Sequence, residues 1–339
     1  MIMEKVNIGI IGCGRIAQDQ TASAVQLKNT RVAAVCDKNK EAAEAFAKKF
    51  GIPKVYTEYE KMLSDPEIQA VYNCTPNFLH AKVAIDAARA KKHVLTQKPF
   101  ANTLEEANEI CKAAEANKII LQAAFFERFR GYCAGIKRCI DEGKIGEVLM
   151  IKAQMSHEGI GKFYHPRTEW FSDTKLAGGG CLADMGAHHL DLMRWFAGSE
   201  VDIIDAQIGF SKDWNTETNA IVNMTFKNGV MAQGHWSFST IAPDGVCYDK
   251  FEIYGDKGTI FVACDSKEEP SIRLVQKGDN HWNEYAYEEV DGFYGMEEHF
   301  ANCILEDKTP ITSGKDGICS VKTILAAYES ARTGQRQKL

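Results

Sequence analysis

The sequence predicts an α/β protein of two domains, which divide its 339 residues near Phe125. Before that point, short and continuously apolar segments alternate with amphipathic helical patterns, as is typical of a parallel sheet with helices on both faces. After it, strand patterns follow one another with few helices between them, which indicates a large, open and mostly antiparallel sheet. We therefore expect an N-terminal domain over residues 1–125 and a C-terminal α/β domain over residues 126–339.

The N-terminal elements follow from these apolar runs and from signals at helix ends. Gly51 is a typical C-cap for the helix after the second strand. Thr103 and Glu106 have the spacing of a capping box, which predicts that another helix begins there. The expected parallel strands are Val6–Ile11, Arg31–Asp37, Ala70–Thr75, His93–Gln97 and Lys118–Ala124.

The C-terminal domain begins with a helix expected from about Arg128 to Asp141 and continues mainly as strands. An Asn-Gly pair within Phe226–Val230 predicts a tight hairpin turn between two of them. One face of the resulting sheet must be covered. The candidate covers are the helix that contains Asp184 and a helix over Gly317–Arg332 near the C-terminus.

The composition argues against several classes of protein. The chain has 45% hydrophobic and 25% charged residues and a formal net charge of −6, which disfavours a general nucleic-acid or anionic membrane surface. No apolar run approaches the roughly 20 residues of a membrane-spanning helix. The N-terminal segment enters a strand without a basic leader or a cleavage site. We expect a cytoplasmic protein that binds neither nucleic acid nor membranes.

The eleven cysteines do not form a pattern that indicates disulfides or a metal site. Their number is odd, and no Cys-x-x-Cys pair occurs. We therefore expect reduced thiols and no bound metal. Cys13, which lies in a glycine loop, is interpreted as a small residue at a tight turn, with a reactive thiol as the alternative.

The segment Gly12–Ala17 reads G-x-G-x-x-A, directly after the first strand and at the start of a helix. This is the context of a dinucleotide-binding loop, in which glycines let the backbone approach a pyrophosphate at a helix N-terminus. Asp37 ends the second strand, where an acid hydrogen-bonds the adenosine ribose and repels a 2′-phosphate. The pattern predicts a Rossmann domain that prefers NAD to NADP, although Lys38 weakens that preference. A glycine turn beside a surface aspartate is the alternative.

Two further loops lie at the carboxyl ends of strands, where open α/β sheets bind ligands. One is Cys74–His80, in which Asn77 can cap the following helix. The other is Thr96–Phe100, in which Lys98 directly precedes a proline. From the loop alone, this lysine is either a solvent-exposed residue at a strand end or a catalytic amine.

The segment Ala177–Trp195 contains three glycines and then a largely apolar helical pattern interrupted by polar residues. At about 100° per residue, Asp184, His188 and Asp191 fall within one stripe, whereas His189 points away from it. The stripe either faces water or serves an active site, in which the carboxylate orients the imidazole and stabilises its charged form. We interpret Asp191 as a supporting or surface partner and His189 as structural.

These motifs occur in the order G-x-G-x-x-A, T-P-N-x-x-H, K-P and G-G-G-x-x-x-D-x-G-x-H-x-x-D. In this order the chain resembles the glucose–fructose oxidoreductase / inositol dehydrogenase (Gfo/Idh/MocA) family, from about Val6 to the C-terminus. The resemblance implies an open C-terminal sheet that often mediates oligomerisation, here into a homodimer or homotetramer. It also implies a catalytic set made of Lys98, Asp184 and His188. The expected cofactor-binding residues are Gly12, Gly14, Arg15, Ile16, Asp37, Thr75, Asn77, His80 and Gln97.

One position departs from the family pattern, which is usually Glu-Lys-Pro. This chain has Gln97-Lys98-Pro99, so a negative charge beside the lysine is missing. We expect the missing charge to leave the catalytic base less basic, and therefore easier to deprotonate near neutral pH.

Residues 156–176 form a long segment rich in aromatic and hydrogen-bonding groups, and long loops near a site often decide specificity. Tyr164, His165 and Trp170 are candidates to stack on and hydrogen-bond a polyhydroxylated ring, or else parts of a packed surface loop. The sequence as a whole predicts an NAD-dependent dehydrogenase that acts on a secondary hydroxyl of a sugar, glycoside or cyclitol. The alternatives are a glycoside 3-oxidase or redox-assisted NAD-dependent glycosidase, and a non-catalytic NAD-binding regulator.

Overall fold

The chain folds into two compact units, and each is described by itself. The first unit holds Met1–Phe126 and Asp291–Ile318, and the second holds Glu127–Val290 and Cys319–Leu339. The computed structural model describes residues 5–159, 169–212, 214–241, 248–264 and 270–339.

This division differs from the boundary drawn from the sequence in one respect. Asp291–Ile318 belongs to the first unit, whereas the sequence placed it in the C-terminal domain. The physical reason is helix α10 (Gly292–Glu306), which packs against the first helix and the first strand of the chain.

In the described part of the chain, the first unit contains a six-stranded parallel sheet in the order β3-β2-β1-β4-β5-β6. The order reverses between β1 and β4, and open sheets of this kind bind ligands at the carboxyl ends of those strands. The five expected strands correspond to β1, β2, β4, β5 and β6, whereas β3 was not expected. The strands are β1 (Val6–Ile11), β2 (Thr30–Cys36), β3 (Lys54–Tyr56), β4 (Ala70–Asn73), β5 (His93–Thr96) and β6 (Leu121–Ala123).

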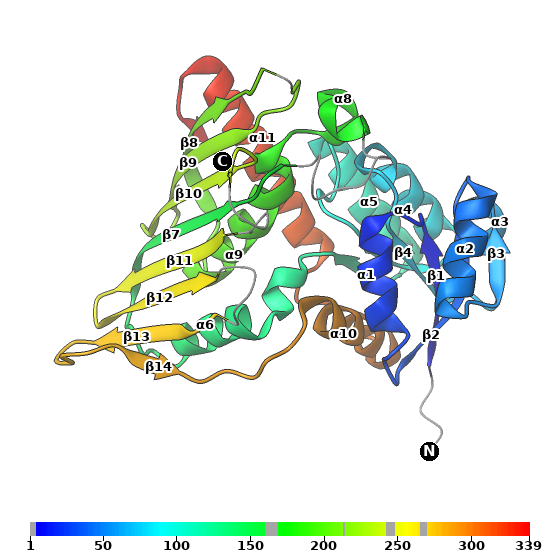
Figure 1. The fold of residues 1–339 in the computed structure, drawn as a ribbon, viewed down its shortest axis with the longest axis horizontal. Coiled ribbons are helices and arrows are strands. Elements are labelled where there is room, and N and C mark those ends of the chain that lie inside the picture. Colours follow the sequence, from blue (N-terminus) through cyan, green and yellow to red (C-terminus); the bar gives the residue numbers. More distant parts are fainter. Residues whose placement is uncertain (1–4, 160–168, 213, 242–247, 265–269) are drawn as a thin grey trace. The chain divides into compact units, whose positions relative to one another are not determined.

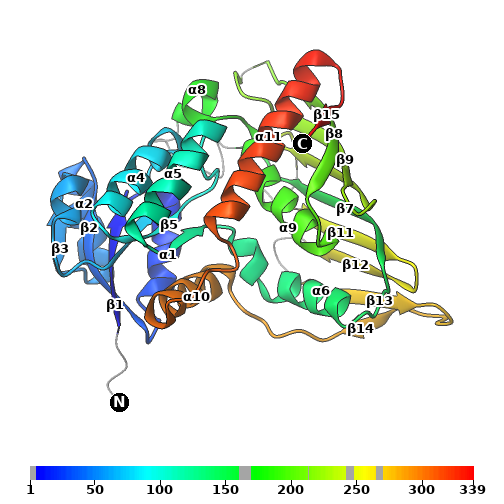
Figure 2. The same cartoon turned by 180° about the vertical axis from the view of Figure 1, so that it is seen from behind.

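Helices cover both faces of this sheet. Figures 1 and 2 show α4 and α5 on one face and α1 on the opposite face. The predicted helix ends are confirmed: Gly51 has a left-handed φ of 68° as a C-cap, and Thr103 and Glu106 form a capping box. The remaining helices of this unit are α1 (Arg15–Ala24), α2 (Lys40–Phe50), α3 (Tyr59–Leu63), α4 (His80–Arg89) and α5 (Leu104–Asn117).

The second unit contains, among its described residues, a nine-stranded sheet in the order β14-β13-β12-β11-β7-β10-β9-β8-β15. The β7–β10 pair is parallel and the other pairings are antiparallel, which confirms the predicted sheet class. The expected hairpin turn joins β9 to β10, with Gly229 at a φ of 89°. The strands are β7 (Val148–Ser156), β8 (Val201–Gly209), β9 (Asn219–Phe226), β10 (Met231–Ser237), β11 (Tyr248–Gly255), β12 (Gly258–Cys264), β13 (Ile272–Gln276), β14 (Asn283–Tyr285) and β15 (Gln337–Lys338).

One face of this sheet is covered by helices α6, α9 and the later part of α11, as Figure 2 shows. Both covers expected from the sequence are therefore present. In the described part of the chain, no helix has the length and apolar character needed to span a membrane. The helices of this unit are α6 (Gly131–Asp141), α8 (Thr174–Ala177), α9 (Ala187–Ala197) and α11 (Gly314–Thr333), whose first residues lie in the first unit.

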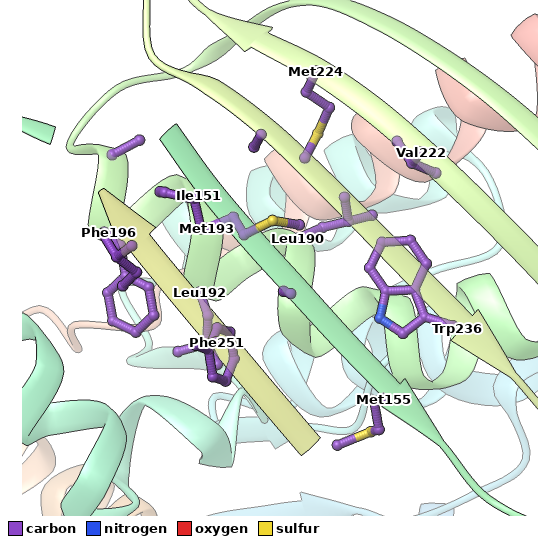
Figure 3. Packing of buried hydrophobic residues seen from close by; sticks show 14 of the residues in the cluster. Ile151, Met155, Leu190, Leu192, Met193, Phe196, Val222, Met224, Trp236 and Phe251 are labelled. Atoms are coloured by element: carbon purple, nitrogen blue, oxygen red, sulfur yellow. The ribbon is translucent and has the colours of Figure 1, made fainter. Parts of the chain in front are cut away.

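Helix α9 packs its apolar side chains directly against the sheet. Leu190, Met193 and Phe196 lie beside strand residues such as Trp236 and Phe251 (Figure 3). Each large apolar side chain buried in this way stabilises the fold by roughly 1.5–3 kcal/mol. The polar residues of the same helical segment are therefore held in place by a well-packed core.

Candidate active site

The glycine loop between β1 and α1 has the shape that a pyrophosphate requires. Gly12 has a φ of 95°, and a Cβ built there would lie 2.5 Å from the backbone oxygen of Cys74. Gly14 is the N-cap of α1, and no described atom lies within 4 Å of a Cβ built on it. The loop therefore leaves the N-terminus of α1 open, where anionic phosphate groups bind.

Asp37 is tied to this loop by its own carboxylate. One oxygen accepts a hydrogen bond from the backbone N–H of Cys13 at 2.9 Å, and the other accepts from the N–H of Asn39 at 2.9 Å. Burial, followed by the charge of Asp37, raises the pKa of Cys13 to about 12. The Cys13 thiol is therefore protonated near neutral pH, which favours the small-residue interpretation over the reactive thiol.

Arg15 and Ile16 form the first turn of α1, and the exposed Arg15 side chain pairs with Asp19 at 3.2 Å. Thr75 follows β4 and donates its hydroxyl hydrogen to the side-chain oxygen of Asn73 at 2.7 Å. Asn77 is buried, 8% exposed, at the start of a short 3₁₀ turn, Asn77–Leu79. These residues lie around the carboxyl ends of β1 and β4, where the sequence placed the cofactor.

His80 joins the loops that follow β4 and β5. Its Nδ1 lies 2.8 Å from the backbone oxygen of Pro99, and its Nε2 lies 2.8 Å from that of Thr75. The ring is 1% exposed, and burial lowers the pKa of His80 despite both contacts. The sequence assigned His80 to the cofactor. Both ring nitrogens lie against backbone oxygens, so His80 supports the loop that carries Lys98, and its role toward the cofactor stays a prediction.

The side chain of Gln97 points into the interior of the first unit. It is 4% exposed, and its side-chain amide donates to the side-chain oxygen of Gln20 at 2.9 Å. The Cys74 thiol donates to the same oxygen at 2.9 Å. On the other side of Gln20 lies Glu297 of α10, which is fully buried. Burial raises the pKa of Glu297 well above its usual range, so burial favours the protonated acid.

Lys98 is half-buried and belongs to the first unit, in a cis peptide bond with Pro99. Asp184 and His188 belong to the second unit and lie on one helical segment. That segment begins with a wide π-helical turn, Leu182–Gly186, which runs without a break into α9. Turns of this kind occur frequently at functional sites.

The two aspartates and two histidines of this helical segment are buried. Asp184 is 6% exposed and His188 is 5% exposed, and Asp191 and His189 are 2% and 0% exposed. The alternative of a stripe that simply faces water is therefore wrong. A carboxylate and an imidazole one turn apart, shielded from water, form a proton-accepting pair whose acid can stabilise the protonated ring.

Asp191 and His189 each have a buried partner outside the helix. The guanidinium of Arg128 donates two hydrogen bonds to Asp191, at 2.6 and 2.5 Å. His189 Nε2 lies 3.1 Å from Asp249, which also accepts from the hydroxyl of Tyr132 at 2.6 Å. Burial alone would raise the pKa of Asp249, but the nearby His189 and the Tyr132 hydroxyl lower it overall. His189 is thus a core residue, as expected, and Asp191 is not on the surface.

Sequence reasoning missed Glu217, which lies in the loop before β9 and is 2% exposed. Its carboxylate accepts hydrogen bonds from the backbone of the glycine segment that precedes Asp184. An acidic residue directly before a strand is the only local signal, and it does not distinguish Glu217 from a surface acid.

The predicted substrate residues are described in part. Trp170 is half-buried in the turn Glu169–Ser172, with its ring stacked on Phe171 at a centroid distance of 4.2 Å. Tyr164 and His165 lie outside the described residues. Among the residues that are described, no group of three or more His, Cys, Asp or Glu side chains is arranged to hold a metal ion.

Comparisons with known proteins agree with this geometry. A family model described as "Oxidoreductase family, NAD-binding Rossmann fold" matches residues 6–125, and a second, described as "GFO/IDH/MocA C-terminal domain", matches residues 134–261. The first unit is thus an NAD-binding Rossmann domain, and its glycine loop and Asp37 fit the pyrophosphate and ribose of NAD.

Similar proteins cover nearly the whole chain. A 1,5-anhydro-D-fructose reductase from Ensifer adhaerens is 28% identical, with 98% of each chain covered. A myo-inositol 2-dehydrogenase from Thermotoga maritima is 25% identical, again with 98% of each covered. The solved structure of an aldose-aldose oxidoreductase from Caulobacter crescentus, complexed with glycerol, has a TM-score of 0.89 at 25% identity. It covers 99% of this chain and 100% of its own.

Proposed function

Because the chain belongs to the Gfo/Idh/MocA oxidoreductase family, we propose that it interconverts a secondary hydroxyl and a ketone on a sugar, glycoside or cyclitol. The observation that carries the proposal is the buried pair of Asp184 and His188, one helical turn apart. Oxidation of a carbinol needs a base for the hydroxyl proton, and a shielded imidazole backed by a carboxylate is suited to that work.

Each residue of the set has a distinct part in this proposal. His188 takes the hydroxyl proton during oxidation and returns it during reduction, while Asp184 orients the ring and stabilises its charged form. Lys98 holds the substrate oxygen and stabilises the negative charge that develops on it. NAD, when bound, accepts the hydride or, as NADH, supplies it. Asp37 and the glycine loop hold the two ends of its adenosine diphosphate part.

The substrate class is supported by the relatives and by the aromatic and hydrogen-bonding residues of the segment 156–176. The relatives described above are named for 1,5-anhydro-D-fructose and myo-inositol, which are both polyhydroxylated rings. Trp170 is proposed to stack on such a ring, and Tyr164 and His165 are proposed to hydrogen-bond its hydroxyls. The odd number of cysteines and the lack of a Cys-x-x-Cys pair favour a reducing, cytoplasmic location.

A panel of sugars, inositols and glycosides, incubated with NAD and followed by the absorbance of NADH, tests this function. Steady accumulation of NADH with a polyol ring supports the proposal. Release of the aglycone without net NADH identifies instead a glycosidase that returns its hydride within one turnover. If NAD binds but no substrate in the panel is oxidised or reduced, the non-catalytic regulator becomes the better account.

The exposed face of the second unit's sheet supports an oligomer. Alternation along β9 and β10 directs Ile221 and Met231 away from the helices, and these side chains are 48% and 55% exposed. We propose that this face pairs with a second copy of the chain in a homodimer or homotetramer. Light scattering should report more than one chain per particle, and Ile221→Lys with Met231→Lys should lower that number. A monomeric wild type would contradict the proposal.

A further inference from the structure

The N-terminus of the Asp184 helical segment is capped by a residue from another part of the second unit. The N–H groups of Gly180 and Leu182 donate to the two carboxylate oxygens of Glu217, at 2.7 and 3.0 Å. The N–H of Cys181, between them, donates to the backbone oxygen of Glu217 at 3.1 Å. The first N–H groups of a helix have no partner within the helix. Glu217 therefore satisfies three consecutive donors at the start of this one.

The fit between Glu217 and this segment is close. A Cβ at Gly180 would overlap the backbone oxygen of Glu217, so only glycine permits the contact. The hydroxyl of Tyr328, on α11, donates to the same carboxylate at 2.8 Å. The glycine segment is thus held by two residues that are distant from it in sequence.

The carboxylate cannot be replaced by an amide without losing part of this cap. One oxygen of Glu217 accepts from Gly180, and the other accepts from both Leu182 and Tyr328. Glutamine has a single acceptor oxygen, so its NH₂ group would face one of these donors. Burial raises the pKa of Glu217, so its ionised form opposes folding as the pH rises.

We propose that Glu217 is a positioning residue: by capping the glycine segment, it fixes the π-helical turn that carries Asp184 and, one turn later, His188. The inference rests on the proposed function, because positioning has a kinetic meaning only if these two residues act on the substrate. A displacement of about 1 Å at such a pair can lower a rate about a hundredfold.

The test compares Glu217→Gln with Glu200→Gln. Glu200 follows α9 and pairs with Arg194 of that helix at 2.9 Å, so its substitution is the same chemical change near the opposite end of the helix. We expect Glu217→Gln to lower kcat about tenfold or more, with the Kd for NAD and the KM for substrate each within about twofold of wild type. Glu200→Gln should leave kcat within about twofold. If the folded Glu217→Gln enzyme retains wild-type kcat, or if both variants lose it equally, the proposal is wrong.

Hydrogen exchange of the backbone amides separates this inference from the proposed function. Glu217→Gln should speed exchange in a peptide that covers residues 178–188, and Glu200→Gln should not. Unchanged exchange there overturns the cap even if the enzyme is active. If exchange is faster in Glu217→Gln but the wild type turns over no polyol, the cap is real and the proposed function is wrong. The positioning role of Glu217 is then wrong as well. Should Glu217→Gln fail to fold, Tyr328→Phe decides: we expect about a two- to fivefold lower kcat, and an unchanged kcat contradicts the proposal.

Discussion

The loop Thr96–Phe100 in the first unit and the Asp184 helical segment in the second are both held by buried polar side chains, but by different kinds. Near Lys98 the supporting groups are the imidazole of His80 and the amides of Gln97 and Gln20. The amides are uncharged, and burial favours the uncharged form of the imidazole. Around the helical segment they are carboxylates: Glu217 on its N-terminus, Asp191 with Arg128, and Asp249 with His189.

The difference has a physical consequence. A neutral hydrogen bond contributes roughly 0.5–1.5 kcal/mol, and a buried neutral group that loses its partner costs about 1–3 kcal/mol. A buried charge that loses its partner remains desolvated and unpaired, which costs several kcal/mol. The buried Glu297 of the first unit adds to this contrast, because burial raises the pKa of Glu297 and so favours its uncharged form. We therefore expect single substitutions to disturb the surroundings of the helical segment more than those of the lysine.

The largest effect is expected at Arg128. Arg128→Ala leaves Asp191 as a buried carboxylate without its two strongest donors, so we expect it to lower the free energy of unfolding by about 3–5 kcal/mol. Arg31→Ala is the matched control, because its ion pair with Glu67 is on the surface, with the two side chains 50% and 32% exposed. That substitution should cost about 1 kcal/mol or less. If both variants lose the same free energy of unfolding in urea, the buried ion pair is no more costly to break than the exposed one, and the expected contrast is wrong.

The proposed catalytic set compares the two regions directly. His188→Ala and Lys98→Ala should each lower kcat by about a hundredfold or more, the usual contribution of an acid–base or charge-stabilising group. NAD binding, measured by fluorescence titration, should survive in His188→Ala. His189→Ala should keep most of its kcat but lose stability, because Asp249 is left buried beside a cavity. If His188 and His189 cause equal kinetic losses, the assignment of the helix face is wrong.

The elements that the sequence predicted are those with a local signal. The strands β1, β2, β4, β5 and β6 are continuously apolar, because both faces of a parallel sheet are covered. Strand β3 has no such run, since its residues Lys54–Tyr56 are only partly buried or exposed, and it was missed. Helix α10 was not predicted, and its apolar face alone does not say which core it joins.

The site was predictable to a similar extent. The glycine loop, Asp37 and the Asp184–His188 spacing are short-range patterns, so they were visible in the sequence. Glu217 and Gly180 are separated by 37 positions, and His189 and Asp249 are also brought together only by the fold. For the same reason the sequence did not show what holds His80, whose assignment to the cofactor stays a prediction. Its contact with Pro99 spans 19 positions and depends on two separate strand ends.

A smaller effect is expected at Asp37, whose carboxylate accepts a hydrogen bond from the backbone of the glycine loop. Asp37→Ala should raise the Kd for NAD about tenfold, because a charged acceptor for the ribose hydroxyls is lost. It should affect NADP less, since the repulsion of the 2′-phosphate is also removed. Titration of the wild type and the variant with both cofactors measures the gap between them. A wild type that binds NADP as tightly as NAD would show that Lys38 overrides the acid.

Glu297 provides a pH-dependent test of the first unit. Burial raises the pKa of this acid, so the folded chain holds a proton that the unfolded chain releases. The stability that this proton contributes is complete below the ordinary pKa of glutamate and is lost as the pH rises toward the raised value. Glu297→Gln should therefore reduce the loss of Tm between about pH 5 and pH 9. If Tm falls with pH equally steeply in the variant and the wild type, the acid is already ionised in the folded chain.

The smallest effect is expected from restoring the acid of the usual family motif with Gln97→Glu. A carboxylate about 6 Å from a protonated base, at an effective dielectric constant near 20, stabilises it by roughly 2–3 kcal/mol, or about 1–2 pH units. The structure reduces this upper limit, because the side chain at position 97 is buried and directed toward Gln20. We expect the limb of kcat/KM that reports deprotonation of the catalytic base, the limb that rises with pH, to move to higher pH by less than about one unit.

The control for this last comparison is Gln97→Met, which removes the contact with Gln20 without adding a charge. It should leave the limb in place, so that a shift in Gln97→Glu alone identifies an electrostatic effect. The wild-type profile also bears on the base itself: a limb near about pH 6–7 favours His188, and one well above about pH 8 favours Lys98. Because Gln97 lies in the first unit, a shift shows that the base responds to charge beside the lysine loop. An unmoved limb in Gln97→Glu would mean that position 97 does not influence the base, and that the loss of the family's acid here has only a structural consequence.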